Sequence, residues 1–479
     1  MMPANNLEQL TALDSLFLTQ EAADTPMHIG MLMFYTPPKA KKGPVRFKDI
    51  LETFRARAHT APIFHRTVGN VPLGIDYPFW LDAQDLDVEF HVRHIALPTP
   101  GDWRQLCIQV ARLQARVIDR SRPLWEAYVI EGLDNVGFLP PGSFAVLYKM
   151  HHAAVDGASA LEAIHALHDE KPRPGKASPP ADYQPLSKPG SLELFGRAYI
   201  NRLRSPARWL KAVRDIAPIP GRLRQGFKEQ RLQSLKERHS TRFNGPISAH
   251  RAVEARFFDL DEVKAIKASV ETMTINDVMV TVVAGALRKY LESKGELPTF
   301  SPMAMIPVSY RSEEEQDAGG NLVTAMSMAI HSEIEDPLER LQQVHEESIS
   351  SKGYTEAIGA RTTQDLAQII PPQLASLAVL RSGTQLMFSS GASAPVNTVI
   401  TNVAGAQGPL YLCGAKLVCC AGLGPIMDSM GLFHAVMSCN GKISIAINAC
   451  RDMLPDPGFY AECIQSSYEE LRDATIGDP

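Results

Sequence analysis

The first 170 residues alternate short apolar runs with stretches of helical periodicity. Residues 31–35 and 144–150 are short, almost entirely apolar runs with several aromatic side chains, which predicts buried strands. Residues 106–118 place apolar side chains three and four positions apart, which predicts a helix. Residues 158–168 predict another helix for the same reason. Strands and helices mixed in this way indicate an α/β layer arrangement.

Ordered patterning resumes after residue 251. Three further segments predict helices: 259–270, 275–291 and 462–471. Asn440-Gly441 separates two runs with alternating apolar residues, 433–439 and 442–448, which predicts a tight β-hairpin turn. The chain shows no fixed-period repeat, which argues against solenoids and propellers.

The segment from Lys171 to His250 differs from both patterned regions. It opens with KPRPGKASPP, whose prolines cannot propagate a helix or a strand ladder. From Arg197 to Arg238, twelve Lys and Arg face three acids, a net of +9, whereas the whole chain carries −5 and the remainder therefore −14. We interpret this segment as an interdomain linker with amphipathic helices. The alternative is a surface for anionic lipid headgroups, and nucleic acid is a remote third because no known motif accompanies the charge.

Length and composition describe a globular protein. The 479 residues are 45% hydrophobic and 21% charged, as in soluble proteins of two or three domains. We expect an N-terminal half at 1–170, the linker at 171–250 and a C-terminal half at 251–479. No apolar run approaches the ~18 residues of a membrane span, and the first ten residues lack the features of a secretory signal. Seven cysteines without CxxC spacing favour reduced thiols in a cytoplasmic protein.

The sharpest candidate site is HHAAVDG, residues 151–157, directly after a predicted strand. Adjacent side chains on a strand point to opposite faces, so only one of His151 and His152 can face a given cleft. A neutral histidine there could take the hydroxyl proton of an alcohol as the oxygen attacks an acyl carbon. Asp156 either orients that histidine or, as we favour, is turned away and ion-paired to hold the turn. Gly157 is expected to take a positive φ in a sharp turn.

Other chemistries have weaker signatures. His165 and His168 lie near the doublet, but adjacent histidines diverge and the H-E-x-x-H zinc pattern is absent, so a metal site is a minor alternative. The chain also lacks G-x-S-x-G, the P-loop sequence and G-x-G-x-x-G, the commonest signatures of serine hydrolases, ATP-driven enzymes and nicotinamide enzymes. We therefore expect neither a metal nor a cofactor.

HHAAVDG resembles the HHxxxDG motif of CoA-dependent acyltransferases. Further segments resemble one branch of that superfamily, the bacterial bifunctional wax ester synthase/diacylglycerol acyltransferase family. These segments are LDSLFLTQEAADTPMHIG, FHVRHIALPTPGDWRQL, the PLW of Pro123-Leu124-Trp125, the ND of Asn276-Asp277, and IPVSYR. The likeness covers nearly the whole chain outside the basic segment.

The resemblance implies two chloramphenicol-acetyltransferase-like α/β sandwich domains with an active-site tunnel between them. Acyl-CoA and the acceptor alcohol would enter this tunnel from opposite sides. By the same likeness, His152 is the general base, His151 is its supporting neighbour, and Asp156 with Gly157 shapes the loop.

The resemblance also assigns residues around these histidines. Asn276 and Asp277 would lie on the second half near the reacting groups. Asn276 would either donate a hydrogen bond to the developing oxyanion or cap a helix that begins near Asp277. Pro123 and Leu124 would support the pocket wall, and Trp125 would either join them or fill the core.

The implied reaction moves a long-chain acyl group from acyl-CoA to a long-chain alcohol or to diacylglycerol, giving a wax ester or triacylglycerol. Two alternatives stay open: a condensation-type enzyme with a carrier-protein-bound donor, and a catalytically silent lipid-binding protein of the same fold. Peripheral contact with an anionic inner membrane or a lipid inclusion would use residues 197–238. One departure from the family is Asn402-Val403-Ala404-Gly405-Ala406, which replaces an NVPGP-like stretch. Its alanines should leave that loop more flexible or differently routed, which bears on acceptor preference.

Overall fold

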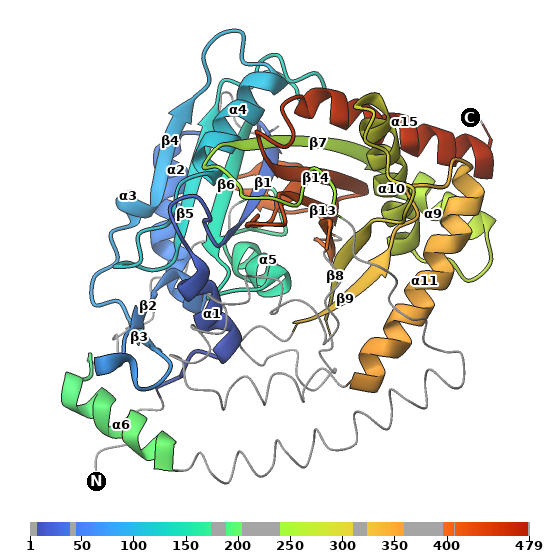
Figure 1. The fold of residues 1–479 in the computed structure, drawn as a ribbon. Helices are drawn as coiled ribbons and strands as arrows, with labels where there is room; N and C mark the ends of the chain where they lie inside the picture. The colour runs from blue at the N-terminus through green and yellow to red at the C-terminus, as the bar shows by residue number, and fades with distance from the viewer. Residues whose placement is uncertain are drawn as a thin grey trace.

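The computed structural model describes residues 7–38, 45–173, 188–203, 240–309, 323–358, 396–406 and 408–477. Within these ranges the strands form two six-stranded mixed sheets and one two-stranded sheet. Figure 1 shows the blue-to-cyan N-terminal part on one side and the yellow-to-red C-terminal part on the other, with helix α5 between them. This arrangement agrees with the predicted α/β fold of two sheet-containing halves.

The first sheet has the strand order β11-β12-β1-β6-β5-β4. Its neighbours are antiparallel except for β4 and β5, which run parallel. The strands are β1 (His28–Thr36), β4 (Val92–Ala96), β5 (Trp125–Glu131), β6 (Phe144–His151), β11 (Tyr411–Leu412) and β12 (Ala415–Leu423). The runs predicted at 31–35 and 144–150 are therefore neighbouring strands of one sheet, where each is buried on both faces.

The second sheet has the strand order β7-β14-β13-β10-β8-β9. Strand β10 runs parallel to β8 and to β13, and the other pairs are antiparallel. The strands are β7 (Arg251–Asp259), β8 (Met303–Ser309), β9 (Val323–Ala329), β10 (Thr398–Ala404), β13 (Leu432–Cys439) and β14 (Lys442–Cys450). The predicted hairpin joins β13 to β14, and the positive φ of Asn440 (50°) and Gly441 (77°) fits the turn that such a pair favours.

Two strands cross from the C-terminal region into the first sheet. Strand β12 pairs with β1, with Gly30 opposite Leu423, and β11 completes that edge. Strand β12 also packs against β13 of the second sheet. The sheets therefore do not divide at residue 251, because residues 411–423 belong to the first one.

Helices cover the outer faces and the junction. The larger ones are α1 (Ala12–Gln20), α2 (Phe47–Arg57), α4 (Trp103–Gln114), α5 (Gly157–Ala166), α6 (Ser191–Leu203), α9 (Leu260–Ser269), α10 (Ile275–Ser293), α11 (Pro337–Ile358) and α15 (Pro457–Thr475). A short helix α3 (Val88–His91) precedes β4, and α6 lies beside the small sheet of β2 (Arg66–Gly69) and β3 (Phe79–Asp82). Helix α10 packs against α9, α11 and α15, α4 packs against β7, and α5 contacts β10, so two helices of the first half touch the second sheet.

The helix predictions hold in their positions and differ at their ends. Helix α4 stops at Gln114, whereas the periodicity predicted 118. Two features accompany the early end: Val117 is 44% exposed, and the carbonyl of Arg116 accepts a hydrogen bond from the buried Lys149 ammonium at 2.7 Å. Helix α15 begins at Pro457, before the predicted 462, because proline suits the first turn of a helix.

Three large apolar clusters form the core of the described residues, and a small fourth lies between α6 and the sheet of β2 and β3. One packs the face of the first sheet that α5 covers, another packs the opposite face under α4, and the largest lies in the second half. Phe17, Met27 and Ala153 belong to this largest cluster although they come from the first half. None of the described helices is long and apolar enough to cross a membrane. Most of the basic segment, residues 204–239, lies outside the described residues.

Candidate active site

Strand β6 ends at His151, which lies in the protein interior. The residue is fully buried, and its backbone N–H donates to the carbonyl of Leu124 at 2.9 Å. The N–H of Ala153 donates to His151 Nδ1 at 3.0 Å, and Nε2 lies 3.3 Å from Glu21 Oε2. Because Nδ1 accepts a hydrogen bond, the proton of the neutral ring resides on Nε2, which lies beside the Glu21 carboxylate. His151 is thus held by a hydrogen bond at Nδ1 and faces a carboxylate at Nε2.

His152 follows the last strand residue and has different neighbours. Its ring stacks on Phe17 of α1, with centroids 4.2 Å apart and planes 12° apart. Its backbone N–H donates to the carbonyl of Met27 at 2.8 Å. The residue is half-buried, and desolvation lowers the pKa of His152 to about 4. The imidazole is therefore neutral at physiological pH, and the two histidines diverge as the strand geometry predicted.

Asp156 caps the helix that follows the doublet. Its Oδ1 accepts a hydrogen bond from the Ser159 N–H at 2.8 Å, and its own N–H donates to the Ser159 hydroxyl oxygen at 3.1 Å, which makes a capping box at the start of α5. The favoured structural role agrees with this geometry, in which the carboxylate acts as a helix cap. Asp156 still lies near enough to His152 to favour its protonated form electrostatically.

Gly157 has a different structural role from the predicted one. It is the first residue of α5 and is absent from the residues with positive φ, so the expected left-handed turn is wrong. A Cβ atom at this position would lie 3.2 Å from Val403 Cγ2, closer than most real contacts. Glycine therefore lets β10 of the second sheet approach the start of α5.

The second half brings Asn276 to the same region. Asn402, which precedes Val403 on β10, donates a long hydrogen bond of 3.5 Å to Asn276 Oδ1. Asn276 does not cap α10, because Thr274 is the N-cap and accepts a hydrogen bond from the Asp277 N–H at 3.2 Å. The cap alternative is therefore wrong, since α10 begins two residues earlier than that alternative requires.

Asp277 is occupied by contacts within the second half. It is 1% exposed, and its Oδ2 accepts the Thr274 N–H at 2.9 Å, which completes the capping box. The same oxygen lies 2.9 Å from Nδ1 of His345 on α11. These contacts tie α10 to α11, and the sequence offered no local signal for His345.

The PLW residues support the first sheet. Leu124 and Trp125 are fully buried, and the Leu124 carbonyl receives the His151 N–H as described above. Pro123 precedes them, and its carbonyl accepts the Trp125 N–H at 2.8 Å. The Trp125 indole stacks on His91 at 4.5 Å, and its Nε1–H donates to the Phe64 carbonyl at 3.1 Å. Trp125 therefore fills the core, one of its two predicted roles.

The other histidines of the motif region are turned away from the doublet. His168 Nε2 lies 2.7 Å from the Tyr35 hydroxyl, and its Nδ1 lies 2.7 Å from the Ile164 carbonyl. His165 is exposed on α5. Throughout the described residues, no three His, Cys, Asp or Glu side chains gather as a metal site would require.

Sequence reasoning missed Glu21 and its partners. Its side chain is only 4% exposed, and it accepts hydrogen bonds from the Met27 N–H at 3.0 Å and from Arg120 Nε at 2.8 Å. Burial alone would raise the pKa of Glu21, but the contacts with His151, Met27 and Arg120 together lower it to about 2. Glu21 lies within the N-terminal segment that carries the family likeness, and no local spacing marks it as a site residue.

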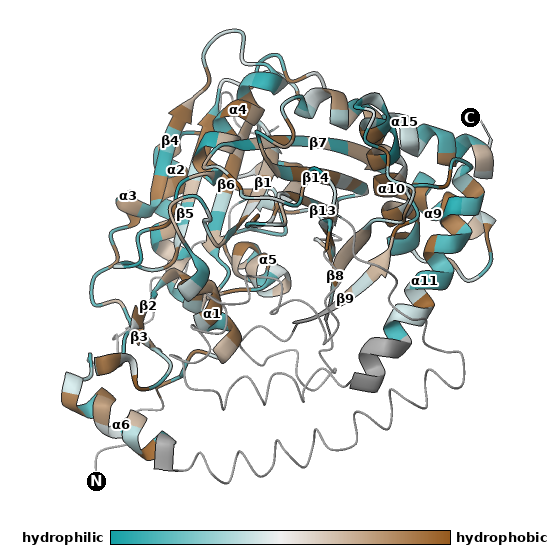
Figure 2. Ribbon diagram, viewed as in Figure 1, coloured by the Kyte–Doolittle hydropathy of each residue, from teal (hydrophilic) through white to brown (hydrophobic). Residues whose placement is uncertain are grey.

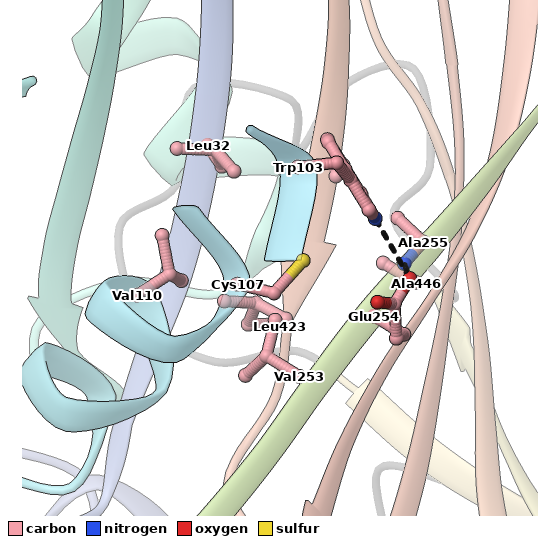
Figure 3. Close-up of a pocket in the computed structure, with 10 residues that line it drawn as sticks. Leu32, Trp103, Cys107, Val110, Val253, Glu254, Ala255, Leu423 and Ala446 are labelled. Atoms are coloured by element: carbon pink, nitrogen blue, oxygen red, sulfur yellow. Dashed lines mark hydrogen bonds between the residues drawn. The ribbon is translucent and has the colours of Figure 1, made fainter. Parts of the chain in front are cut away.

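A small cavity lies on the α4 side of the first sheet (Figure 3). Trp103, Cys107 and Val110 line it from α4, and the Trp103 indole N–H donates to Glu254 at 2.8 Å. Its volume of about 10 Å³ holds one water-sized molecule at most. Ligand pockets commonly measure ~300–1,000 Å³, so this cavity is not the predicted substrate tunnel.

Known proteins are similar in sequence to this chain over most of its length. Residues 10–279 match the wax ester synthase/diacylglycerol acyltransferase catalytic domain, and residues 319–472 match the WS/DGAT C-terminal domain. The chain is 31% identical over 475 residues to the probable diacylglycerol O-acyltransferase tgs2 of Mycobacterium tuberculosis, covering 96% of this chain and 98% of that protein. A putative diacylglycerol O-acyltransferase of the same species is 30% identical over 470 residues, with 97% and 99% covered.

Solved structures show the same fold. The wax ester synthase/diacylglycerol acyltransferase from Marinobacter aquaeolei VT8 superposes with a TM-score of 0.69 at 24% identity, covering 98% of this chain and all of that one. The first condensation domain of the calcium-dependent antibiotic synthetase gives a TM-score of 0.59 at 14% identity, with 99% and 98% covered. The predicted fold is thus confirmed. The domain matches and the relatives establish that the chain belongs to the wax ester synthase/diacylglycerol acyltransferase family.

Proposed function

We propose that this protein transfers a long-chain acyl group from acyl-CoA to the hydroxyl of a long-chain alcohol or of diacylglycerol, with His152 as the general base. Family membership and the names of the relatives support the reaction type. The observation that carries the proposal for this chain is the neutral imidazole of the half-buried His152, next to the apolar cluster that spans the two halves.

The proposed reaction proceeds by direct transfer. His152 takes the proton of the acceptor hydroxyl as that oxygen attacks the thioester carbon, and a tetrahedral intermediate forms. The carbon–sulfur bond then breaks, and the imidazolium returns the proton to the leaving thiolate, giving an ester and free CoA. Because Nδ1 of His152 is buried, Nε2 is the nitrogen that we assign to this exchange. General-base catalysis of this kind contributes about 10²–10⁴-fold.

Asn276 is our candidate for a residue of the second half that stabilises the reaction intermediate. Its contact with Asn402 places it beside β10, and β10 reaches the first turn of α5 through Val403. A side-chain amide in this position could donate to the oxyanion of the intermediate. The departure from the NVPGP-like pattern lies on the same strand, which supports its assignment to acceptor preference. The substrate tunnel between the halves also remains a proposal.

Replacement of the base tests this function. His152→Ala should lower the rate of CoA release and of ester formation by at least about 100-fold, with an unchanged melting temperature. His165→Ala is the matched control, because His165 is an exposed histidine on α5. Turnover of His152→Ala within tenfold of the wild type would contradict the assignment. Acyl-carrier protein, tried as donor in the same assay, distinguishes the condensation-type alternative.

We also propose peripheral contact with anionic lipid through residues 197–238 and the adjoining face of α6. Leu194 and Ala198 of α6 pack on the small sheet, whereas Leu192 is 89% exposed and Tyr199 is 56% exposed. Figure 2 shows α6 at the edge of the molecule with apolar positions among polar ones. Exposed apolar side chains next to a basic segment suit a headgroup interface. Leu192→Ser should weaken co-sedimentation with anionic vesicles, and the idea fails if binding is unchanged both in that variant and after several of the arginines are neutralised.

A further inference from the structure

We propose that Glu21 is a positioning residue for His152, acting chiefly through the ring of His151 and secondarily through the backbone of Met27. The inference rests on the proposed role of His152 and concerns how that side chain is held. Glu21 follows the last residue of α1 and serves as its C-cap, with its N–H donating to the Phe17 carbonyl at 3.2 Å. One helical turn therefore carries both Phe17 and Glu21.

This turn contacts each member of the histidine doublet with a different side chain. The Phe17 ring stacks on His152, and the Glu21 carboxylate lies 3.3 Å from His151 Nε2. Residues four apart on a helix lie on the same face, so a single rigid element reaches both histidines. A displacement at the end of α1 would move both contacts together.

Glu21 also holds the backbone that receives His152. Its Oε2 accepts the Met27 N–H at 3.0 Å, and the Met27 carbonyl in turn accepts the His152 N–H at 2.8 Å. Its other oxygen accepts the Arg120 Nε–H at 2.8 Å. Both oxygens are thus engaged by donors, and the carboxylate joins three segments that are distant in sequence.

A carboxylate suits this position better than its amide. Glu21 accepts hydrogen bonds from two donors, the Met27 N–H and the Arg120 guanidinium. Its third neighbour, His151 Nε2, lies 3.3 Å away and carries the ring proton, because Nδ1 of His151 accepts from Ala153. The low pKa of Glu21, about 2, agrees with a group that stays ionised beside these donors. In Glu21→Gln, the amide NH₂ would necessarily face a donor on one side.

The experiment combines Glu21→Gln with His151→Ala in the full-length protein, using one long-chain acyl-CoA and hexadecanol. We expect Glu21→Gln to lower kcat between about ten- and a hundredfold, as for a misplaced catalytic group, and to change the KM for acyl-CoA less than threefold. In the His151→Ala background, Glu21→Gln should lower kcat less than threefold. The His151 ring, through which Glu21 chiefly acts on His152, is already absent there. Glu21→Asp, which keeps the charge, should recover part of the rate.

Asp169→Asn provides the matched control. Asp169 is a similarly enclosed carboxylate that pairs with Arg57 at 2.5 Å in the same half, with its side chain 14% exposed. The Asp169→Asn variant should keep its kcat within threefold of the wild type. Equal losses in the single and the double variant would overturn the inference, as would a rise in KM without a fall in kcat. If His152→Ala retains turnover, the proposed base is wrong; if His152→Ala is inactive and Glu21→Gln is normal, only the role of Glu21 is wrong.

Discussion

The desolvation of His152 predicts an unusual pH dependence for acyl transfer. Histidine ordinarily titrates near ~6.5, whereas burial against Phe17 and its neighbours lowers the pKa of His152 to about 4. A base works only in its neutral form, so a lower pKa extends activity to lower pH. The acid limb of kcat/KM should therefore be centred near pH 4.

The size of the effect follows from these two pKa values. At pH 5.5 a histidine with a pKa of about 4 is about 97% neutral, whereas one with an ordinary pKa is about 9% neutral. The rate constant kcat/KM at pH 5.5 should therefore stay close to its value at pH 7.5. An ordinary histidine would retain only about a tenth of it.

Replacement of Phe17 tests whether burial lowers the pKa of His152. It is 4% exposed and stacks flat on the imidazole, so Phe17→Ala should admit water beside the ring and move the acid limb upward, toward 6.5. Phe17→Leu is the control, because leucine keeps most of the apolar volume and should shift the limb less. Removing a buried phenylalanine costs about 3–5 kcal/mol of stability, so the melting temperature of each variant is measured first.

The assay quantifies ester by chromatography after rapid quenching, from pH 4 to 8, at acyl-CoA concentrations below KM. Samples incubated at each pH and returned to pH 7.5 must regain full activity, which separates titration from acid unfolding. A wild-type limb centred at 6 to 6.5 that does not move in Phe17→Ala would refute the reasoning. It would mean that His152 is solvated or that another group controls the rate.

Three further predictions concern the close approach at Gly157, the cap of α10 and the buried His434. Gly157→Ala should lower kcat/KM because its Cβ would lie 3.2 Å from Val403, and adding Val403→Ala should restore much of the loss in the same steady-state assay. Thr274→Ala should lower the free energy of unfolding in urea by about 1 kcal/mol through loss of an N-cap, whereas Asn276→Ala should change it by less than about 0.5 kcal/mol. His434 is fully buried with its pKa lowered to about 3 by desolvation, so the unfolded chain binds more protons and stability falls as pH drops below ~6.5. At pH 5 this one site should lower the free energy of unfolding by about 2 kcal/mol. His434→Asn should therefore make the urea midpoint depend less steeply on pH. An equally steep dependence in the variant would contradict this.

Local pattern determined much of the outline. Apolar periodicity located β1, β6, α5 and α10, and Asn440-Gly441 located the hairpin, because each of these signals is contained in a few consecutive residues. The divergence of His151 and His152 also follows from the chain itself, since neighbouring strand residues face opposite sides. The family likeness added the two-part fold, which the solved relatives share.

Tertiary structure decided the features that depend on partners far along the chain. The insertion of β12 beside β1 joins residues separated by most of the sequence, and no local pattern specifies such a pairing. The ordinary pKa of a histidine says nothing about Phe17, which desolvates His152 only in the folded protein. Likewise Glu21 reaches His151, and Val403 approaches Gly157, through packing that brings separate elements together. The sequence thus indicated which groups are candidates for the chemistry, and the fold determined their environment, because burial, charge and approach are properties of the assembled neighbours.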